Sequence, residues 1–389
     1  MVRNGLCTGT GATFELSLVH EGEFSSTYLA QHTATGVRLL MRSFDKELVF
    51  ANATAYGRLC HEHDALASLA LLPHPFLVRH IVSAQDDDFL YVGMAYVVGG
   101  DLQKLLETRG PLPPEHARVY AAEICLAIGH MHSFDILHRD LKPENVLIAS
   151  DCHVKLGDFA SSKRLHGRID VDHPPPAQDV SLCGTPEYIA PEILLAQPCC
   201  ETADWWSFGC FVSELLCGRT PFGEPDQQIG DLVRKIIHED ITLPEHGHIG
   251  PMESELLHEL LRRTPADRLG AREQGGHHAV FASPWFASMT IDSVLRKQQN
   301  VAWARDPATT SIFSISGLAD TLLGESLEET APALELMAES HGQGVHHIIQ
   351  APQLPQEVEA SSIIVNPIQQ PFADWERIEV QIRDDPPDS

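Results

Sequence analysis

A short stretch at residues 138–145, with the sequence HRDLKPEN, contains side chains that suit phosphoryl transfer from ATP. That reaction needs a carboxylate to take the proton of the substrate hydroxyl, a cation near the γ-phosphate and an amide for a metal ion. Asp140, Lys142 and Asn145 could supply these groups, and Asp158 offers a second metal-binding carboxylate. A lone HRD is weak evidence, but these residues in order, followed by an Asp-Phe pair, are a strong signal.

The residues on either side of this stretch predict a loop between two regular elements. In 116–131 the apolar residues recur at the spacing of one buried helix face. Residues 146–148, Val-Leu-Ile, read as a β-strand. A loop in this context can hold polar groups over a packed base.

With these motifs the chain resembles a eukaryotic protein kinase, over about residues 14–286. Further motifs are similar to the cyclic-nucleotide-dependent, lipid-dependent and S6-type kinases, the AGC group: LCGTPEY at 182–188, DWW at 204–206, DRLG at 267–270 and SPWF at 283–286. The resemblance implies an α+β, two-lobed protein-kinase fold. We expect a small β-rich amino-terminal lobe at 14–96, a larger and mainly α-helical carboxy-terminal lobe at 97–286, and a tail at 287–389.

The resemblance also assigns roles to the side chains of the central stretch. Asp140 would orient or deprotonate the hydroxyl of a Ser/Thr protein substrate, and Lys142 would stabilise the transferring phosphoryl group. Asn145 and Asp158 would hold Mg²⁺, so the implied cofactors are ATP and Mg²⁺. Two structural features are implied as well: Asp204 bracing the backbone of the catalytic loop, and a buried bridge between Glu192 and Arg268.

The amino-terminal lobe departs from the family pattern at its nucleotide-binding positions. Runs at 14–18, 24–30 and 37–44 read as strands. Kinases place GxGxxG between the first two, because backbone amides must approach the phosphates without Cβ atoms in the way. Here only Gly22 and the tip aromatic Phe24 remain.

The third strand carries Leu40 where the family has Ala and Arg42 where it has the Lys that pairs with the phosphates. Arg has a larger, planar cation, and Leu40 adds bulk at the roof of the adenine pocket. Glu62 fits the helix carboxylate that pairs with the cation, although a solvated helix glutamate is the alternative. The nucleotide-binding residues that the resemblance implies are Gly22, Phe24, Thr27, Leu40, Arg42, Glu62, Met94 as gatekeeper, Asp101 near the ribose, and Leu147.

Substrate preference and regulation can be read from the same resemblance. Asp101, Glu144 and Glu214 stand where basophilic relatives recognise Arg upstream of the phosphorylated residue. Ser181 precedes the LCGTPEY motif and is a candidate phosphosite for an upstream activating kinase. Its basic partners would be Arg139, Arg58 and Lys163, and a phosphate there can order a loop. An unmodified surface serine remains the alternative.

The tail has a different composition, with three arginines against fifteen acidic residues in 298–389, which predicts a largely unstructured segment. One island in it, FADWE at 372–376, has two aromatic residues, Phe372 and Trp375, followed by an acidic Glu376. This matches the AGC tail motif that docks on the amino-terminal lobe. A short apolar patch in a disordered tail is the alternative.

The composition restricts the class of protein further. A formal net charge of −27 argues against a general nucleic-acid or anionic-membrane binder. Nine cysteines without a CxxC pair favour reduced thiols. The first twenty residues have no apolar segment typical of a signal peptide, and no apolar run is long enough to span a bilayer. We expect a cytoplasmic monomer with access to the nucleus.

Three hypotheses about function remain open at this point. The chain is an active Ser/Thr kinase, or it is a pseudokinase that scaffolds or allosterically regulates a partner, or its relevant activity lies in the acidic tail. Leu40, Arg42 and the missing glycines favour the pseudokinase. The intact catalytic groups of the carboxy-terminal lobe favour the enzyme.

Overall fold

The computed structural model describes residues 2–8, 13–165, 184–197, 199–224, 227–241, 243, 248–301 and 376–380. The chain divides into two units. The first takes in residues 1–73, 79–96 and 324–389, and the second takes in 74–78 and 97–323. No helix in the described part of the chain is long and apolar enough to cross a lipid bilayer.

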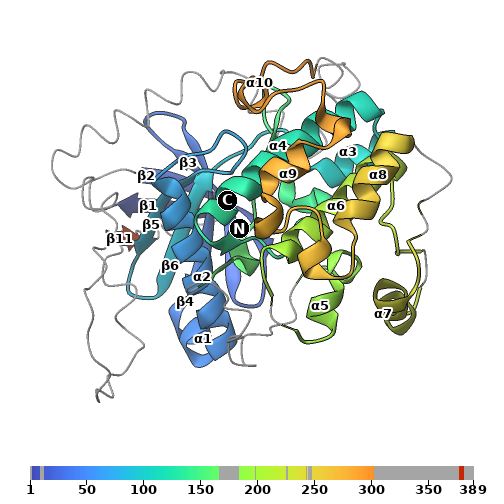
Figure 1. Ribbon diagram of the computed structural model, residues 1–389. Helices are drawn as coiled ribbons and strands as arrows, with labels where there is room; N and C mark the ends of the chain where they lie inside the picture. The colour runs from blue at the N-terminus through green and yellow to red at the C-terminus, as the bar shows by residue number, and fades with distance from the viewer. Residues whose placement is uncertain are drawn as a thin grey trace, which may run out of the picture. The chain divides into compact units, whose positions relative to one another are not determined.

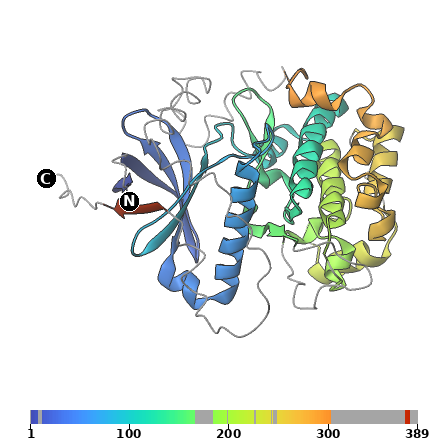
Figure 2. The same cartoon turned by 60° about the vertical axis from the view of Figure 1, so that its left-hand side comes forward.

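The first unit is built on a closed β-barrel (Figures 1 and 2). Its strands are β1 (Val2–Thr8), β2 (Thr13–Glu21), β3 (Ser25–His32), β4 (Arg38–Asp45), β5 (His80–Gln85), β6 (Phe89–Ala95) and β11 (Glu376–Val380). They follow one another around the barrel in the order β1-β11-β5-β6-β4-β3-β2. All neighbours are antiparallel except β11 and β5, which are parallel.

The core of the barrel follows from the alternation of apolar residues along its strands. In β2, Phe14 and Leu16 are buried while Glu15 between them is exposed, as expected for a strand with one buried face. The buried cluster also draws residues from β3, β4, β5 and β6; its full membership is Phe14, Leu16, Tyr28, Ala30, Val37, Leu39, Met41, Ala84 and Tyr91.

Two helices of the first unit connect β4 to β5. Helix α1 (Lys46–Ala51) begins at Asp45, whose side chain accepts hydrogen bonds from two backbone amides of the first turn. Helix α2 (Ala53–Ala70) is capped in the same way by Asn52 and lies beside the strands, as Figure 2 shows. Its buried residues, Leu59, Glu62, Ala65, Leu66 and Leu69, recur at the spacing of one helix face.

The second unit is mainly helical and packs around α4 (Pro114–Ser133) and α6 (Thr202–Cys217). Helix α6 is buried on nearly all sides, and large aromatics such as Trp205, Trp206 and Phe208 are fully enclosed. The other helices are α3 (Leu102–Arg109), α5 (Pro191–Leu194), α7 (Ile229–His238), α8 (Pro251–Leu260), α9 (His277–Phe281) and α10 (Ile291–Leu295). Two short β-ribbons complete the unit: β7 (Ile136–Leu137) with β10 (Lys163–Arg164), and β8 (Val146–Ile148) with β9 (Val154–Leu156).

A β-rich first unit and a helical second unit confirm the fold class predicted from the sequence. The sequence predicted no regular element in the tail, where residues 291–295 form α10 and residues 376–380 form β11; the largely unstructured character of 298–389 stays a prediction. Strand β1 was not predicted either, because the resemblance begins only near residue 14. Ser181, Phe372 and Trp375 lie outside the described residues.

Candidate active site

The backbone of the loop 138–145 is held in place by hydrogen bonds to Asp204 of α6. The carboxylate of Asp204 accepts hydrogen bonds from the backbone amides of His138, at 2.9 Å, and Arg139, at 2.8 Å. It also accepts one from His132 Nε2, at 2.8 Å. Burial alone would raise the pKa of Asp204, but the hydrogen bond and charge of His132 lower it, so the brace is anionic.

Two residues of the site have backbone angles that are unfavourable for side chains with a Cβ. Arg139 has φ of 66° and Asp158 has φ of 51°. The bonds to Asp204 hold Arg139 in this conformation, and its Nε donates to the carbonyl oxygen of Ser161 at 2.7 Å. Such strain is typical of active-site loops that the surrounding structure fixes.

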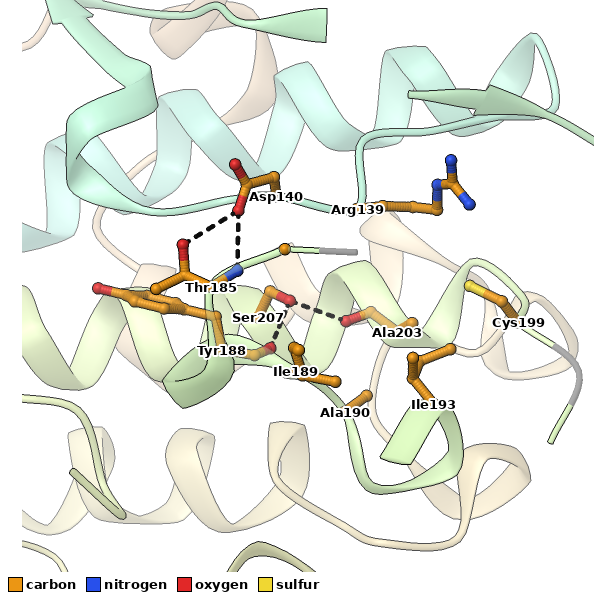
Figure 3. A pocket seen from close by; sticks show the side chains of 11 residues that line it. Arg139, Asp140, Thr185, Tyr188, Ile189, Ala190, Ile193, Cys199, Ala203 and Ser207 are labelled. Atoms are coloured by element: carbon orange, nitrogen blue, oxygen red, sulfur yellow. Dashed lines mark hydrogen bonds between the residues drawn. The ribbon is translucent and has the colours of Figure 1, made fainter. Parts of the chain in front are cut away.

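Asp140 lies at the centre of a polar cluster with Thr185 (Figure 3). Its Oδ1 accepts hydrogen bonds from the backbone amide of Thr185, at 3.2 Å, and from the Thr185 hydroxyl, at 3.3 Å. Lys142 Nζ lies 3.6 Å from Asp140 Oδ2 and donates to Thr185 Oγ1 at 2.7 Å. Asn145 Nδ2 donates to the Asp140 carbonyl oxygen at 2.7 Å and to Oδ2 at 3.1 Å. The structure therefore brings three predicted catalytic side chains together.

Gly184 allows the backbone next to Thr185 to approach the loop 138–145 closely. Its φ is 98°, and a Cβ at this position would lie only 2.8 Å from the carbonyl oxygen of Arg139. Any side chain there would push Thr185 away from Asp140.

A pocket lies beside Asp140, and its lining is mostly apolar (Figure 3). Tyr188, Ile189, Ala190, Ile193 and Ala203 form much of its wall. Ser207 of α6 fixes one side, since its hydroxyl donates to the carbonyl oxygen of Tyr188 at 2.8 Å. The arrangement places an apolar surface next to the Asp140 carboxylate.

The side chains of Asn145 and Asp158 provide the oxygen ligands that Mg²⁺ prefers. Asn145 uses its amide nitrogen to bind Asp140, which leaves its amide oxygen as an acceptor. Asp158 is exposed and follows Gly157, whose backbone amide donates to the carbonyl oxygen of Asn145 at 2.8 Å. One amide and one carboxylate fit an ion that takes its remaining ligands from phosphates and water.

The first unit holds the predicted phosphate anchor. Arg42 Nη1 of β4 lies 2.5 Å from Glu62 Oε1 of α2, and the Glu62 side chain is almost fully buried. The guanidinium also lies over the ring of Phe44, 5.1 Å from its centroid. Thr27 of β3 is the cross-strand neighbour of Arg42. The positive charge at this position is thus held by a buried carboxylate.

The remaining nucleotide-binding candidates of the first unit lie on its strands and on one hairpin. Gly22 and Phe24 lie at the turn between β2 and β3, where the Gly22 amide donates to the Ser25 carbonyl oxygen at 2.9 Å. Leu40 lies between Leu29 and Met94 on the neighbouring strands.

Asp101 and Leu147 belong to the second unit. Asp101 begins helix α3, where its side chain accepts from the amide of Lys104 at 2.9 Å, and its backbone pairs with Leu147. The geometry therefore shows a helix-capping role for Asp101, and its contact with the ribose stays a prediction.

Among the basic residues predicted around Ser181, Arg139 contacts Ser161 and Lys163 lies in β10 opposite Leu137. Arg58 is exposed on α2. Their contacts with Ser181 remain a prediction, because Ser181 is not among the described residues.

An acidic cluster near the pocket was predicted only in part. The Tyr188 hydroxyl donates to Glu214 of α6. Burial, and then the nearby charges of Glu144 and Glu187, raise the pKa of Glu214 to about 8. Sequence reasoning named Glu144 and Glu214 but missed Glu187 and the contact of Thr185 with Asp140. Thr185 and Glu187 both belong to the GTPEY motif at 184–188, which was the available signal for them.

The buried bridge between Glu192 and Arg268 is present in the second unit. Two parallel hydrogen bonds join them, at 2.6 and 2.8 Å, and both side chains are at most 1% exposed. The Arg268 guanidinium also lies 5.2 Å from the ring centroid of Trp206. This pair ties the segment after the pocket to the base of the unit.

Comparison with known proteins agrees with this geometry. Residues 15–286 match the family described as protein kinase domain. The chain is 32% identical over 276 residues to cAMP-dependent protein kinase type 3 of Saccharomyces cerevisiae, and the aligned region covers 71% of this chain and 65% of that protein. It is 32% identical over 278 residues to human 3-phosphoinositide-dependent protein kinase 1, and the aligned region covers 71% of this chain and 48% of that protein. The matched region thus spans less than two thirds of the length of these relatives.

Proposed function

The chain belongs to the protein kinase family, in its AGC group, and we propose that it transfers the γ-phosphoryl group of ATP to serine and threonine hydroxyls of proteins. The observation that carries this proposal is the cluster of Asp140, Lys142, Asn145 and Thr185. It places an ammonium group 3.6 Å and an amide 3.1 Å from one oxygen of the Asp140 carboxylate.

Each group of the cluster has a role in the proposed reaction. A substrate hydroxyl that enters the site donates its hydrogen bond to Asp140, which orients the oxygen and takes its proton. Thr185 and Asn145 fix the two Asp140 oxygens, so the carboxylate is positioned before the substrate arrives. Lys142 offsets the negative charge of the group in transfer.

Asn145 and Asp158 would hold Mg²⁺. When bound, this ion neutralises phosphate charge.

The acidic cluster supports a preference for substrates with a basic residue near the phosphorylated one. Glu144, Glu187 and Glu214 lie close enough to raise the pKa of Glu214, so the cluster holds unfavourable negative charge. A bound guanidinium would relieve it and donate bidentate hydrogen bonds to the carboxylates. The apolar residues that line the pocket beside Asp140 would contact a neighbouring apolar residue of the substrate. We therefore propose a basophilic substrate preference.

Regulation by phosphorylation of Ser181 through an upstream kinase, and action as a cytoplasmic monomer, belong to the same proposal. Arg139 supports the first point, because its side chain already contacts the start of the segment that leads to Ser181. The aromatic residues Phe372 and Trp375 are proposed to dock on the first unit, since Glu376 directly after them begins a strand of its barrel.

The rival function is a pseudokinase scaffold, and Arg42 and Leu40 are the residues that favour it. Arg42 keeps the positive charge beside Glu62, so attraction to phosphates is retained, but its guanidinium needs more room than an ammonium group. Leu40 adds apolar bulk beside Met94. Each effect is worth about 1–2 kcal/mol, which together would weaken ATP binding roughly ten- to a thousand-fold.

Isothermal titration with Mg·ATP separates the two functions. We expect weak, Mg-dependent binding by the unaltered chain and tighter binding by the Leu40→Ala, Arg42→Lys double variant. A control with exposed residues of the same unit changed, Leu72→Ala and Arg79→Lys, should bind like the unaltered chain. If neither the unaltered chain nor the double variant binds millimolar nucleotide, the scaffold replaces the enzyme. Micromolar binding by the unaltered chain would disprove the roles given to Leu40 and Arg42.

A further inference from the structure

Strand β11 from the end of the chain is paired along both of its edges. On one side it is antiparallel to β1, with Leu6 opposite Val380, Cys7 opposite Glu379 and Thr8 opposite Ile378. On the other side it is parallel to β5, with Glu376 opposite Ala84 and Arg377 opposite Gln85. Among the described strands, β1 has one other neighbour, β2, and β5 has one other neighbour, β6. Without β11 the barrel would open and both strands would become edges.

The interior of the barrel is formed by the face of the sheet that points away from α2. Arg42 of β4 points to α2, because it pairs with Glu62. Residues that alternate with Arg42 along a strand point the other way, and these are Leu39 and Met41, which belong to the buried barrel core. Ala84 of β5, the direct neighbour of β11, belongs to the same core and is 2% exposed. The apolar face opposite α2 is thus the inner face of the closed barrel.

The sequence of the tail suits such a strand. Within an otherwise acidic and polar segment, apolar Ile378 and Val380 alternate with charged Arg377 and Glu379. Alternation with period two is the pattern of a half-buried strand. A segment that forms no strand would not need this alternation of apolar and charged residues.

We propose that β1 and β5 form an acceptor slot for an extended peptide segment, and that residues 376–380 of the same chain are its occupant. Recognition is by backbone hydrogen bonds along both edges, as in peptides that bind by adding a strand to a sheet. The slot differs from an ordinary sheet edge because its occupant is antiparallel to one wall and parallel to the other. This inference does not depend on the proposed catalytic function.

The register of the pairing allows a direct test in the full chain. Cys7 lies opposite Glu379, and facing residues of antiparallel strands have the Cα separation that a disulfide requires. In the Glu379→Cys variant, mild oxidation should join position 379 to Cys7 within one chain, as shown by peptide mapping and non-reducing electrophoresis. The matched Arg377→Cys variant should not form this link, because position 377 faces Gln85. Links between two chains would assign the slot to a second copy, and no link at all would disprove the pairing; either result overturns the proposal.

Hydrogen exchange tests whether the slot can be emptied and refilled. Ile378→Pro removes a backbone donor from the middle of β11 and should speed amide exchange in 2–8 and 80–85 by about tenfold or more. Asp385→Pro, beyond the end of the strand at Val380, should not. A synthetic peptide of residues 371–385 should bind the Ile378→Pro chain more tightly than the unaltered chain and slow exchange in 80–85. Unchanged exchange in the Ile378→Pro chain, equal binding by both chains, or equal binding by a peptide with proline at 378 would overturn the proposal.

Discussion

Asp204→Asn should disturb the conformation of the catalytic loop 138–145, because Asp204 binds the backbone of this loop. The native carboxylate accepts three hydrogen bonds, two on Oδ2 and one on Oδ1. An asparagine side chain of nearly the same shape has one oxygen and one NH₂ group. Whichever way it turns, its NH₂ group faces a donor, and that donor loses its acceptor.

The magnitude follows from these three bonds. In the better orientation the partly buried amide of Arg139 is left unpaired, which costs about 1–3 kcal/mol. The bonds from His132 and His138 remain but lose their charged acceptor, at about 1 kcal/mol each. The sum is about 3–5 kcal/mol, or roughly 6–20 °C in Tm for a unit of this size.

Thermal denaturation followed by circular dichroism measures this loss, and peptide phosphorylation measures its effect on Asp140. We expect kcat to fall with Tm, because Arg139 no longer holds its positive φ and Asp140 follows it in the loop. Asp231→Asn on exposed α7 is the matched control and should change little. If Asp204→Asn melts within about 2 °C of the unaltered chain and keeps its activity, the brace described above is not what positions the loop.

Two further predictions concern the second unit. Arg268→Met should lower the free energy of unfolding by about 3–5 kcal/mol in urea titrations, because Glu192 is left buried without its partner; the double variant Glu192→Met, Arg268→Met should be less destabilised than the single one, and the opposite order would refute the pairing. Glu214, with its pKa raised to about 8, binds a proton in the folded chain that the unfolded chain has lost, so it lowers stability as pH rises from about 4.5 to 8. The Tm of Glu214→Gln relative to the unaltered chain should therefore increase between pH 5 and pH 8, and a pH-independent difference would rule out the raised pKa.

The catalytic loop and several strands could be predicted from the sequence because their signals are local. The spacing of Asp140, Lys142 and Asn145 defines their chemistry within one short loop, and the alternation around Phe14 and Leu16 defines β2. Only the structure shows that the carboxylate of Asp101 caps α3.

Strands β1 and β11 could not be predicted because their pairing is a long-range property. Residues 376–380 pair with 80–85 and with 2–8, and no local pattern records this partnership. The acidic composition of the tail also outweighed the short alternation of Ile378 and Val380 in the sequence argument. The contact between Thr185 and Asp140 was missed for the same reason, since 45 positions separate them.

The central claim is that Asp140 and the groups around it transfer phosphoryl groups, and one measurement tests it most directly. Incorporation of the γ-phosphate of millimolar Mg·ATP into an arginine-containing serine peptide is compared for the unaltered chain, Asp140→Asn and the exposed control Asp292→Asn. We expect low but measurable transfer by the unaltered chain and the control, and a loss of orders of magnitude in Asp140→Asn, with a cooperative melting transition that shows the variant to be folded at the assay temperature. Equal transfer by all three proteins, or none by the unaltered chain, would contradict the claim.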